Sequence, residues 1–188
     1  MLSYTPTPVA AFHSLDLDKM GIQLLIKRED LNHPLVSGNK WWKLKYNLEE
    51  AARSGKDTIL TFGGAYSNHI YATAAAAKET GLRSIGVIRG ERASPLNPTL
   101  SFAARQGMEL HFLSRYEYSR KNETDFILRL KAQFGDFYLI PEGGTNSRAV
   151  QGCSEFADRE LIKLTFSHLM LPVGTGGTMA GIIHGLAG

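Results

Sequence analysis

Short apolar and β-branched runs alternate along this chain with longer segments whose apolar residues recur at helical spacing. The short runs predict strands over residues 22–27, 58–62, 84–88, 109–113, 137–140 and 169–173. The longer segments predict helices over residues 40–53, 67–81, 97–106, 122–134 and 148–164, with a last helix beginning after residues 174–178. This regular alternation with short links predicts an α/β fold, in which helices flank a parallel sheet on both faces.

Residues that start and stop helices support these boundaries. Ser67 is a favourable N-cap for the alanine-rich helix, and Gly81 is a typical helix stop. Asn97 or Pro98 opens the next helix, since proline is tolerated in a first helical turn. Asn122 is the expected cap of the helix that ends near residue 134. Three of the predicted strands end in glycine-rich loops, and parallel sheets bind ligands beyond the carboxyl ends of their strands.

Composition narrows the class of protein. Hydrophobic residues make up 43% of the 188 residues, which is enough to bury a globular core. The formal charge of +3 is too small and too evenly spread to favour a nucleic-acid partner. A single cysteine, Cys153, favours a reducing compartment. We find no signal peptide and no apolar run long enough for a membrane helix, so we expect a cytoplasmic protein without a membrane partner.

The loop Gly174-Thr175-Gly176-Gly177-Thr178 lies between a predicted strand and a predicted helix. Its glycines allow backbone N–H groups to approach an anion closely, and the helix N-terminus adds a favourable dipole. A phosphate cup is therefore expected, although a tight turn without a ligand explains the same residues. The loop is not a nucleotide P-loop, because no Gly-Lys-Ser/Thr follows it. It is also a poor dinucleotide fingerprint, because Met179 stands where the third glycine would fall.

Lys40 follows Gly38 and Asn39 at the predicted start of a helix, with Lys43 three residues later on the same face. The positive helix start and the neighbouring ammonium both disfavour the charged form, so they lower the pKa of Lys40. Only a neutral amine attacks a carbonyl, which makes Lys40 a candidate for Schiff-base chemistry. The alternative is an ordinary solvated lysine.

Two further loops carry polar groups. The segment Gly63-Gly64-Ala65-Tyr66-Ser67-Asn68-His69 places hydroxyl, amide and imidazole groups at a helix N-terminus, which suits a carboxylate. Plain capping by Ser67 is the alternative. The segment 141–146 is a weaker signal that turn chemistry alone explains. The histidines and the cysteine show no metal-ligand spacing, so no metal is expected.

Taken together, these motifs resemble the fold-type II pyridoxal-phosphate (PLP) enzymes, and within them the 1-aminocyclopropane-1-carboxylate deaminase / D-cysteine desulfhydrase family. The resemblance spans nearly the whole chain and rests on the ordered segments 27–31, 37–40, 43–44, 63–69, 141–144 and 174–178. It implies a two-domain architecture like that of the tryptophan synthase β subunit. Residues 1–38 and 147–188 would belong to the large PLP-binding domain, and residues 39–146 mainly to the smaller domain, with Lys40 at the interface.

The resemblance also implies roles for single residues. Lys40 would carry the cofactor as a Schiff base and later take the Cα proton of the substrate. Lys43 and residues Gly174, Thr175, Gly176, Gly177 and Thr178 would bind the phosphate. Asn68 would lie beside the phenolic oxygen of the cofactor, and Ser67, Asn68 and His69 would form the loop that binds the substrate carboxylate and takes part in catalysis. The implied reaction is D-cysteine desulfhydration or deamination of the cyclopropane amino acid, in a homodimer.

Two departures from the family leave alternatives open. Trp42 stands where many relatives have arginine, and family members are longer, so the chain is expected to lack the end of the large domain. A truncated, catalytically incompetent PLP-fold protein is therefore one alternative. Another fold-type II reaction, such as serine or threonine dehydration, is a second. A nucleotide-binding module is a third, which the missing glycine at Met179 disfavours.

Overall fold

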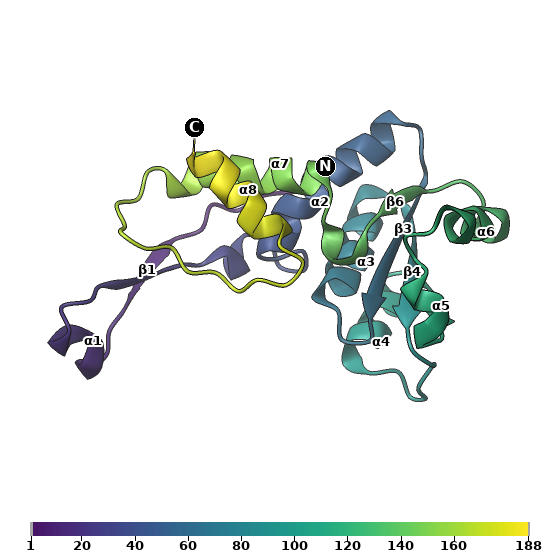
Figure 1. The fold of residues 1–188 in the computed structure, drawn as a ribbon, viewed down its shortest axis with the longest axis horizontal. Helices are drawn as coiled ribbons and strands as arrows, with labels where there is room; N and C mark the ends of the chain where they lie inside the picture. The colour runs from purple at the N-terminus through teal and green to yellow at the C-terminus, as the bar shows by residue number, and fades with distance from the viewer. Residues whose placement is uncertain (1, 188) are drawn as a thin grey trace.

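A computed structural model describes residues 2–187 as an elongated molecule with a sheet-containing lobe at one end and a narrow arm at the other (Figure 1). The arm consists of strands β1 (Val9–Phe12) and β2 (Leu24–Lys27), which pair antiparallel on either side of helix α1 (Leu15–Lys19). Helices α2 (Asn39–Arg53), α7 (Ser147–Phe156) and α8 (Gly177–Leu186) lie between the arm and the lobe (Figure 1).

The lobe is built on a parallel sheet in the order β5-β4-β3-β6. Its strands are β3 (Thr58–Gly64), β4 (Arg83–Arg89), β5 (Glu109–Leu113) and β6 (Tyr138–Ile140). The two central strands, β3 and β4, are almost continuously buried, as expected for a parallel strand covered on both faces. The predicted α/β fold with a flanked parallel sheet is therefore confirmed.

Helices cover both faces of this sheet. Helices α3 (Asn68–Thr80) and α4 (Pro98–Arg105) pack on one face through Ile70, Ala74, Leu100 and Ala103. Helices α5 (Arg115–Ser119) and α6 (Thr124–Phe134) cover the other face through Tyr118, Phe126 and Leu130. Short helical turns occur at η1 (Glu29–Leu31) and η2 (Glu142–Gly144).

A second layer joins α2 (Asn39–Arg53), α7 (Ser147–Phe156) and α8 (Gly177–Leu186). The α2–α7 and α7–α8 contacts are close because glycines lie between the helices. A Cβ on Gly152 would lie 1.9 Å from the carbonyl oxygen of Trp42, and a Cβ on Gly181 would lie 2.7 Å from that of Val150. The largest apolar core fills the space around these helices and includes Trp41, Trp42 and Leu44.

Several predicted elements differ from the structure. Residues 169–173 form no strand, because no extended segment in the described part of the chain pairs with them. The strand predicted over 22–27 exists as β2, but it pairs antiparallel with β1 outside the parallel sheet. The helix predicted over 148–164 is α7, continued by the π-helical turn η3 (Ala157–Leu161). Glu123, rather than Asn122, is the N-cap of α6.

Other predicted boundaries are confirmed. Ser67 caps α3 by accepting a hydrogen bond from the backbone N–H of Ile70, and Gly81 ends that helix with a left-handed φ of 74°. Asn97 caps α4 through the backbone N–H of Leu100, and proline follows in the first turn. Over the residues that the structure describes, no helix is both long and apolar enough to span a bilayer.

Candidate active site

A cavity of about 490 Å³ opens beyond the carboxyl ends of β3 and β4, where parallel sheets bind ligands. The starts of α2, α3 and α8 and the turn η2 surround it. Nearly all the residues predicted for the site line it: Lys40, Lys43, Ser67, Asn68, His69, Gly174, Thr175, Gly176 and Thr178. Gly177 is the exception, since it is buried behind the loop, where an added Cβ would meet Thr145 at 2.8 Å.

Lys40 lies in the first turn of α2 and is half-buried. Burial is the largest cause that lowers the pKa of its ammonium, so the predicted direction is confirmed while the predicted cause is not the main one. Among residues 2–187, no carboxylate pairs with Lys40. A lowered pKa increases the fraction of neutral amine, which is the form that attacks a carbonyl.

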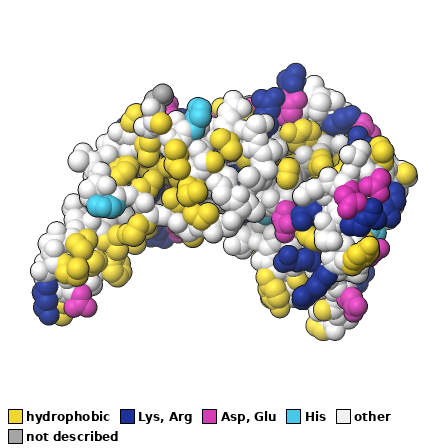
Figure 2. All heavy atoms as spheres, viewed as in Figure 1, with side chains coloured by type: hydrophobic (Ala, Val, Ile, Leu, Met, Phe, Trp, Pro, Cys, Tyr) yellow, Lys and Arg dark blue, Asp and Glu magenta, His cyan; other side chains and the backbone are white. Residues whose placement is uncertain are grey.

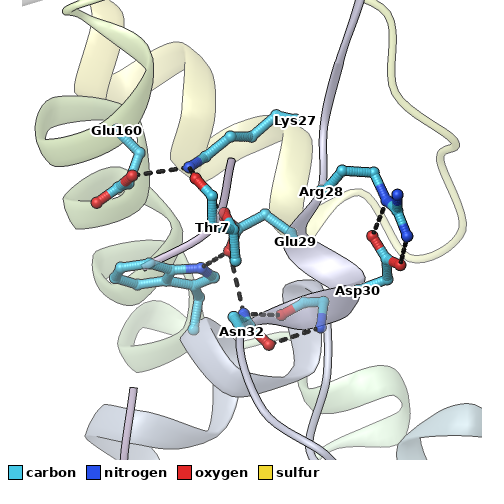
Figure 3. Close-up of polar contacts among 9 residues, drawn as sticks. Thr7, Lys27, Arg28, Glu29, Asp30, Asn32 and Glu160 are labelled. Carbon is cyan, nitrogen blue, oxygen red and sulfur yellow. Dashed lines mark hydrogen bonds and ion pairs between the residues drawn. The ribbon is translucent and has the colours of Figure 1, made fainter. Parts of the chain in front are cut away.

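The backbone before Lys40 is held by a network of hydrogen bonds (Figure 3). The Asn32 side chain donates to the carbonyl of Gly38 at 3.1 Å and accepts from its N–H at 3.1 Å. Gly38 adopts a φ of 68°, which favours glycine. The Glu29 carboxylate accepts from Asn32 Nδ2 at 3.0 Å and from Trp42 Nε1 at 2.7 Å. This network fixes the start of α2, and so the position of Lys40.

Trp42 belongs to this network rather than to the cavity wall. Its ring is 1% exposed and packs edge-on against Trp41 and Tyr4, with centroids 4.8 Å and 5.0 Å away. Lys27 continues the network, because its Nζ donates to the Thr7 carbonyl at 2.7 Å and to Glu160 at 2.8 Å. The residue that departs from the family pattern therefore contributes to the core beneath the site.

Lys43 is buried one turn further along α2, and its ammonium reaches the opposite wall. Its Nζ donates to the Gly143 carbonyl at 2.8 Å, to Thr145 Oγ1 at 2.9 Å and to Thr175 Oγ1 at 3.3 Å. Burial, with the nearby positive charge of Lys40, lowers the pKa of Lys43 to about 8. These contacts tie α2 to the turn η2 and to the glycine loop.

The glycine loop meets the start of α2 directly. Asn39 Nδ2 donates to Thr178 Oγ1 at 2.8 Å, which brings the residue before Lys40 against the end of the loop. Gly174 and Gly176 have open space where a Cβ would lie, and Gly176 has a φ of 79°. Hydroxyl groups, an ammonium and an open glycine backbone are the donors that a phosphate dianion requires, so these residues fit the phosphate of PLP.

His69 forms the floor of the cavity and is 2% exposed. Thr61 Oγ1 uses its hydrogen to bond the Ile140 carbonyl at 2.8 Å, so the contact of 2.8 Å between Thr61 Oγ1 and His69 Nε2 requires the histidine to donate. The Nδ1 atom then accepts from Thr73 Oγ1 at 3.4 Å. Burial, with the charges of Lys40 and Lys43, lowers the pKa of His69 to about 3, so the ring is neutral.

Ser67 and Asn68 form the rim of the cavity at the start of α3. The Ser67 hydroxyl accepts the capping bond from Ile70 N at 3.3 Å, which leaves its own hydrogen available to donate. The Asn68 side chain is exposed. Gly63 lies directly beneath, where a Cβ would meet Ser67 Oγ at 2.8 Å, so the loop requires glycine at this position.

Some residues of the site carried little signal in the sequence. Thr145 follows the turn η2 and binds Lys43, although its segment reads as an ordinary turn. Thr61 lies within a buried strand and shows no motif at all. Arg89 ends β4 beside Gly64 and lines the cavity. In the described part of the chain, no group of three or more His, Cys, Asp or Glu residues is placed to hold a metal ion.

Comparison with known proteins agrees with this geometry. The family model described as "Pyridoxal-phosphate dependent enzyme" matches residues 1–188. The chain belongs to this family. It is 37% identical to a putative 1-aminocyclopropane-1-carboxylate deaminase of Thermotoga maritima, over 99% of this chain and 61% of the relative. It is 33% identical to a mitochondrial bifunctional D-cysteine desulfhydrase/1-aminocyclopropane-1-carboxylate deaminase of Arabidopsis thaliana, over 98% of this chain and 50% of the relative.

The fold of this PLP-family chain matches a solved structure as well. A crystal structure of an ACC deaminase homologue superposes with a TM-score of 0.81 and 30% identity, over 99% of this chain and 57% of that one. The fold is therefore that of the fold-type II PLP enzymes, as predicted. The chain spans between 50% and 61% of the length of these three proteins.

Proposed function

We propose that this chain supplies the lysine and the phosphate-binding residues of a PLP-dependent enzyme that acts on a small amino acid. The proposed reaction is deamination of 1-aminocyclopropane-1-carboxylate or desulfhydration of D-cysteine. One observation carries the proposal: Lys40 and the glycine loop line the same cavity, and the bond of 2.8 Å between Asn39 and Thr178 joins the segments that bear them. The names of the relatives support the two substrates.

Each residue has a role that its surroundings support. PLP, when bound, supplies an electron sink that stabilises negative charge at the substrate Cα. Lys40 Nζ, whose pKa burial lowers, would form the covalent link to the cofactor and accept the proton from the substrate Cα. Lys43, Thr175 and Thr178 bind the phosphate, together with the backbone of the glycine loop. The open wall at Gly174 and Gly176 lets this backbone approach the dianion.

The start of α3 is placed to bind the substrate carboxylate and the phenolic oxygen of the cofactor. Ser67 donates its hydroxyl hydrogen, and the exposed Asn68 its amide hydrogens, to the substrate carboxylate and to the phenolic oxygen of the cofactor. His69 remains neutral and holds the floor of the cavity through Thr61 and Thr73. A neutral imidazole adds no further positive charge to a cavity that already holds Lys40 and Lys43.

Covalent trapping tests the proposed lysine. The purified chain is mixed with PLP, reduced with borohydride and digested, and the peptides are weighed by mass spectrometry. We expect one modified lysine, Lys40, and loss of both the adduct and the visible PLP absorption in Lys40→Ala. The exposed Lys78 gives a matched control, so Lys78→Ala should label like the wild type. An adduct that survives in Lys40→Ala would refute the assignment.

A substrate panel tests the proposed reaction. Turnover of D-cysteine, the cyclopropane amino acid, D-serine and L-serine is followed through pyruvate or 2-oxobutanoate. We expect product from D-cysteine or from the cyclopropane amino acid. Preferential turnover of L-serine would instead favour dehydration.

We also propose a cytoplasmic homodimer. Cys153 is free and buried, which suits a reducing compartment. The arm exposes apolar side chains at Val9, Phe12, Leu25 and Ile26, and Figure 2 shows hydrophobic side chains gathered along it. An apolar surface of this kind favours contact with a second copy. Light scattering of the purified chain should give twice the monomer mass, and Phe12→Ser should shift it toward the monomer.

A further inference from the structure

A second hollow, of about 480 Å³, lies on the sheet lobe beside the active-site cavity. Few residues line it, and most of them are basic: Arg89, Arg115, Tyr118, Ser119 and Lys121. These residues come from separate segments, the end of β4 and the α5 region, which the parallel sheet brings together. Arg89 also lines the active-site cavity, so the two hollows share one guanidinium group.

The three cations are poorly compensated. Lys121 pairs with Glu142 at 3.4 Å, and Glu142 lines the active-site cavity rather than this hollow. Within residues 2–187, neither Arg89 nor Arg115 forms an ion pair with a carboxylate. Like charges that line one hollow repel one another, and an anion among them converts this repulsion into attraction.

Tyr118 gives the hollow a rigid base. Its ring is 2% exposed and lies edge-on to Phe62 in the core, with centroids 6.0 Å apart. The Arg89 guanidinium lies 5.7 Å from the ring centroid and the Lys121 ammonium 4.9 Å from it, distances at which a cation is attracted to an aromatic face. The buried ring therefore holds two of the three cations in place before any ligand arrives.

The Tyr118 hydroxyl is buried and lies beside the Glu142 carboxylate, although their contact falls outside ordinary hydrogen-bond geometry. Burial, with the negative charge of Glu142 and the contact with its carboxylate, raises the pKa of Tyr118, so the hydroxyl keeps its hydrogen. Because Glu142 serves this hydroxyl, the attraction of the hollow for an anion rests on Arg89, Arg115 and Lys121.

We propose that this hollow binds a small oxyanion, a carboxylate or phosphate group, between Arg89, Arg115 and Lys121. Arginine suits both groups, because its planar fork donates two parallel hydrogen bonds. Ser119 also lines the hollow, but its hydroxyl hydrogen is already donated to the Tyr116 carbonyl at 2.6 Å, so the cations supply the donors. Because Arg89 also lines the active-site cavity, the anion would lie next to bound substrate. This site needs neither PLP nor turnover, so it is independent of the function proposed above.

The test is an NMR titration of the ¹⁵N-labelled chain with inorganic phosphate, and separately with succinate, at constant ionic strength. We expect saturable shifts of the amides of residues 115–121 and 89 with at least one of the two anions. Tighter binding of phosphate assigns a phosphate group, and tighter binding of succinate a carboxylate. Shifts at residues 174–178 report the glycine loop separately, so failure of one site is distinguishable from failure of the other.

Variants decide whether the hollow itself is responsible. Arg115→Gln combined with Lys121→Gln should weaken binding at least about tenfold, since hydrogen bonds to charged groups are strong. The matched control combines Arg105→Gln with Lys78→Gln, which removes equal charge from α4 and α3 on the other face of the sheet and should leave affinity unchanged. Tyr118→Phe removes the buried hydroxyl but keeps the ring beside Arg89 and Lys121, so it should fold and leave the affinity unchanged.

Two results would overturn the proposal. One is the absence of saturable shifts at residues 115–121 with either anion. The other is equal affinity in the wild type and in the Arg115→Gln, Lys121→Gln double variant.

Discussion

Gly152 is the position where a single methyl group should do most damage to the site. It lies in α7 against α2, where an added Cβ would be 1.9 Å from the Trp42 carbonyl oxygen and 2.9 Å from its carbon. Real Cβ atoms essentially never approach another heavy atom within 3.0 Å, so the helices must separate by at least 3.0 − 1.9 = 1.1 Å. The obstacle is backbone, which cannot turn aside as a flexible side chain can.

The expected cost of Gly152→Ala is the difference between two effects. Overpacking a well-filled core costs about 1–3 kcal/mol and occasionally more, and a backbone collision belongs at the upper end. Alanine in a helix interior stabilises the folded state by about 0.5–1 kcal/mol relative to glycine. We therefore expect a net loss of about 2 kcal/mol or more, which lowers the melting temperature by roughly 4–8 °C for a chain of this size. Displacement of α2 should also reduce borohydride trapping of PLP on Lys40.

Urea unfolding of the purified variant measures the loss, with far-UV circular dichroism as the probe. The matched control is Gln151→Ala, the neighbour on the same helix, which should cost little because its side chain is exposed. A Gly152→Ala protein as stable as the wild type would show that the two helices do not meet at this glycine.

Three further predictions follow from the polar groups around the cavity. Glu29→Gln puts an amide donor where the carboxylate accepts from Trp42 or Asn32, so it should lower the free energy of unfolding by about 1–3 kcal/mol, measured in urea. The control Glu91→Gln changes an exposed side chain and should leave this free energy unchanged. Lys43 has a pKa of about 8 when folded, below its unfolded value of about 10.4, so the unfolded chain binds more protons between them and stability should rise with pH across that window. Lys43→Met should flatten this rise, and an unchanged slope between pH 8 and 10 would contradict it. His69 has a pKa of about 3 when folded, so ¹⁵N NMR at pH 5 should show a neutral ring protonated at Nε2, and stability should fall as pH drops from about 6.5 toward 3. An imidazolium signal at pH 5 would be incompatible with the buried geometry.

The repeating strand–helix order was predictable because local chemistry sets it. Ser67 and Gly81 define α3 by capping, and the continuous apolar run of β3 identifies a strand covered on both faces. Residues 169–173 have the same local character but form no strand, because a strand also needs a neighbour for its hydrogen bonds. The apolar pattern does not predict helix α5, because the helix has only five residues, although the Ser114–Glu117 capping box marks its start.

The residues of the candidate site also differ in whether the sequence alone predicts them. Lys40 and the glycine loop were predictable, because a lysine after glycine and three closely spaced glycines are visible in sequence. The contacts of Lys43 with Gly143 and Thr145 join residues about a hundred positions apart, and only the folded chain reveals them. The cause of the lowered pKa of Lys40 was hidden for the same reason, because burial depends on packing from distant segments.

The glycine contacts that join α2, α7 and α8 have a mechanical consequence. With no side-chain layer between them, these helices can neither slide nor spread easily, so they act as one stiff block. Lys40 and the start of α8 both stand on this block, whereas Ser67 and Asn68 stand on the sheet lobe. A swing of the lobe would therefore widen or narrow the entrance for an amino acid while the span from lysine to glycine loop stays constant.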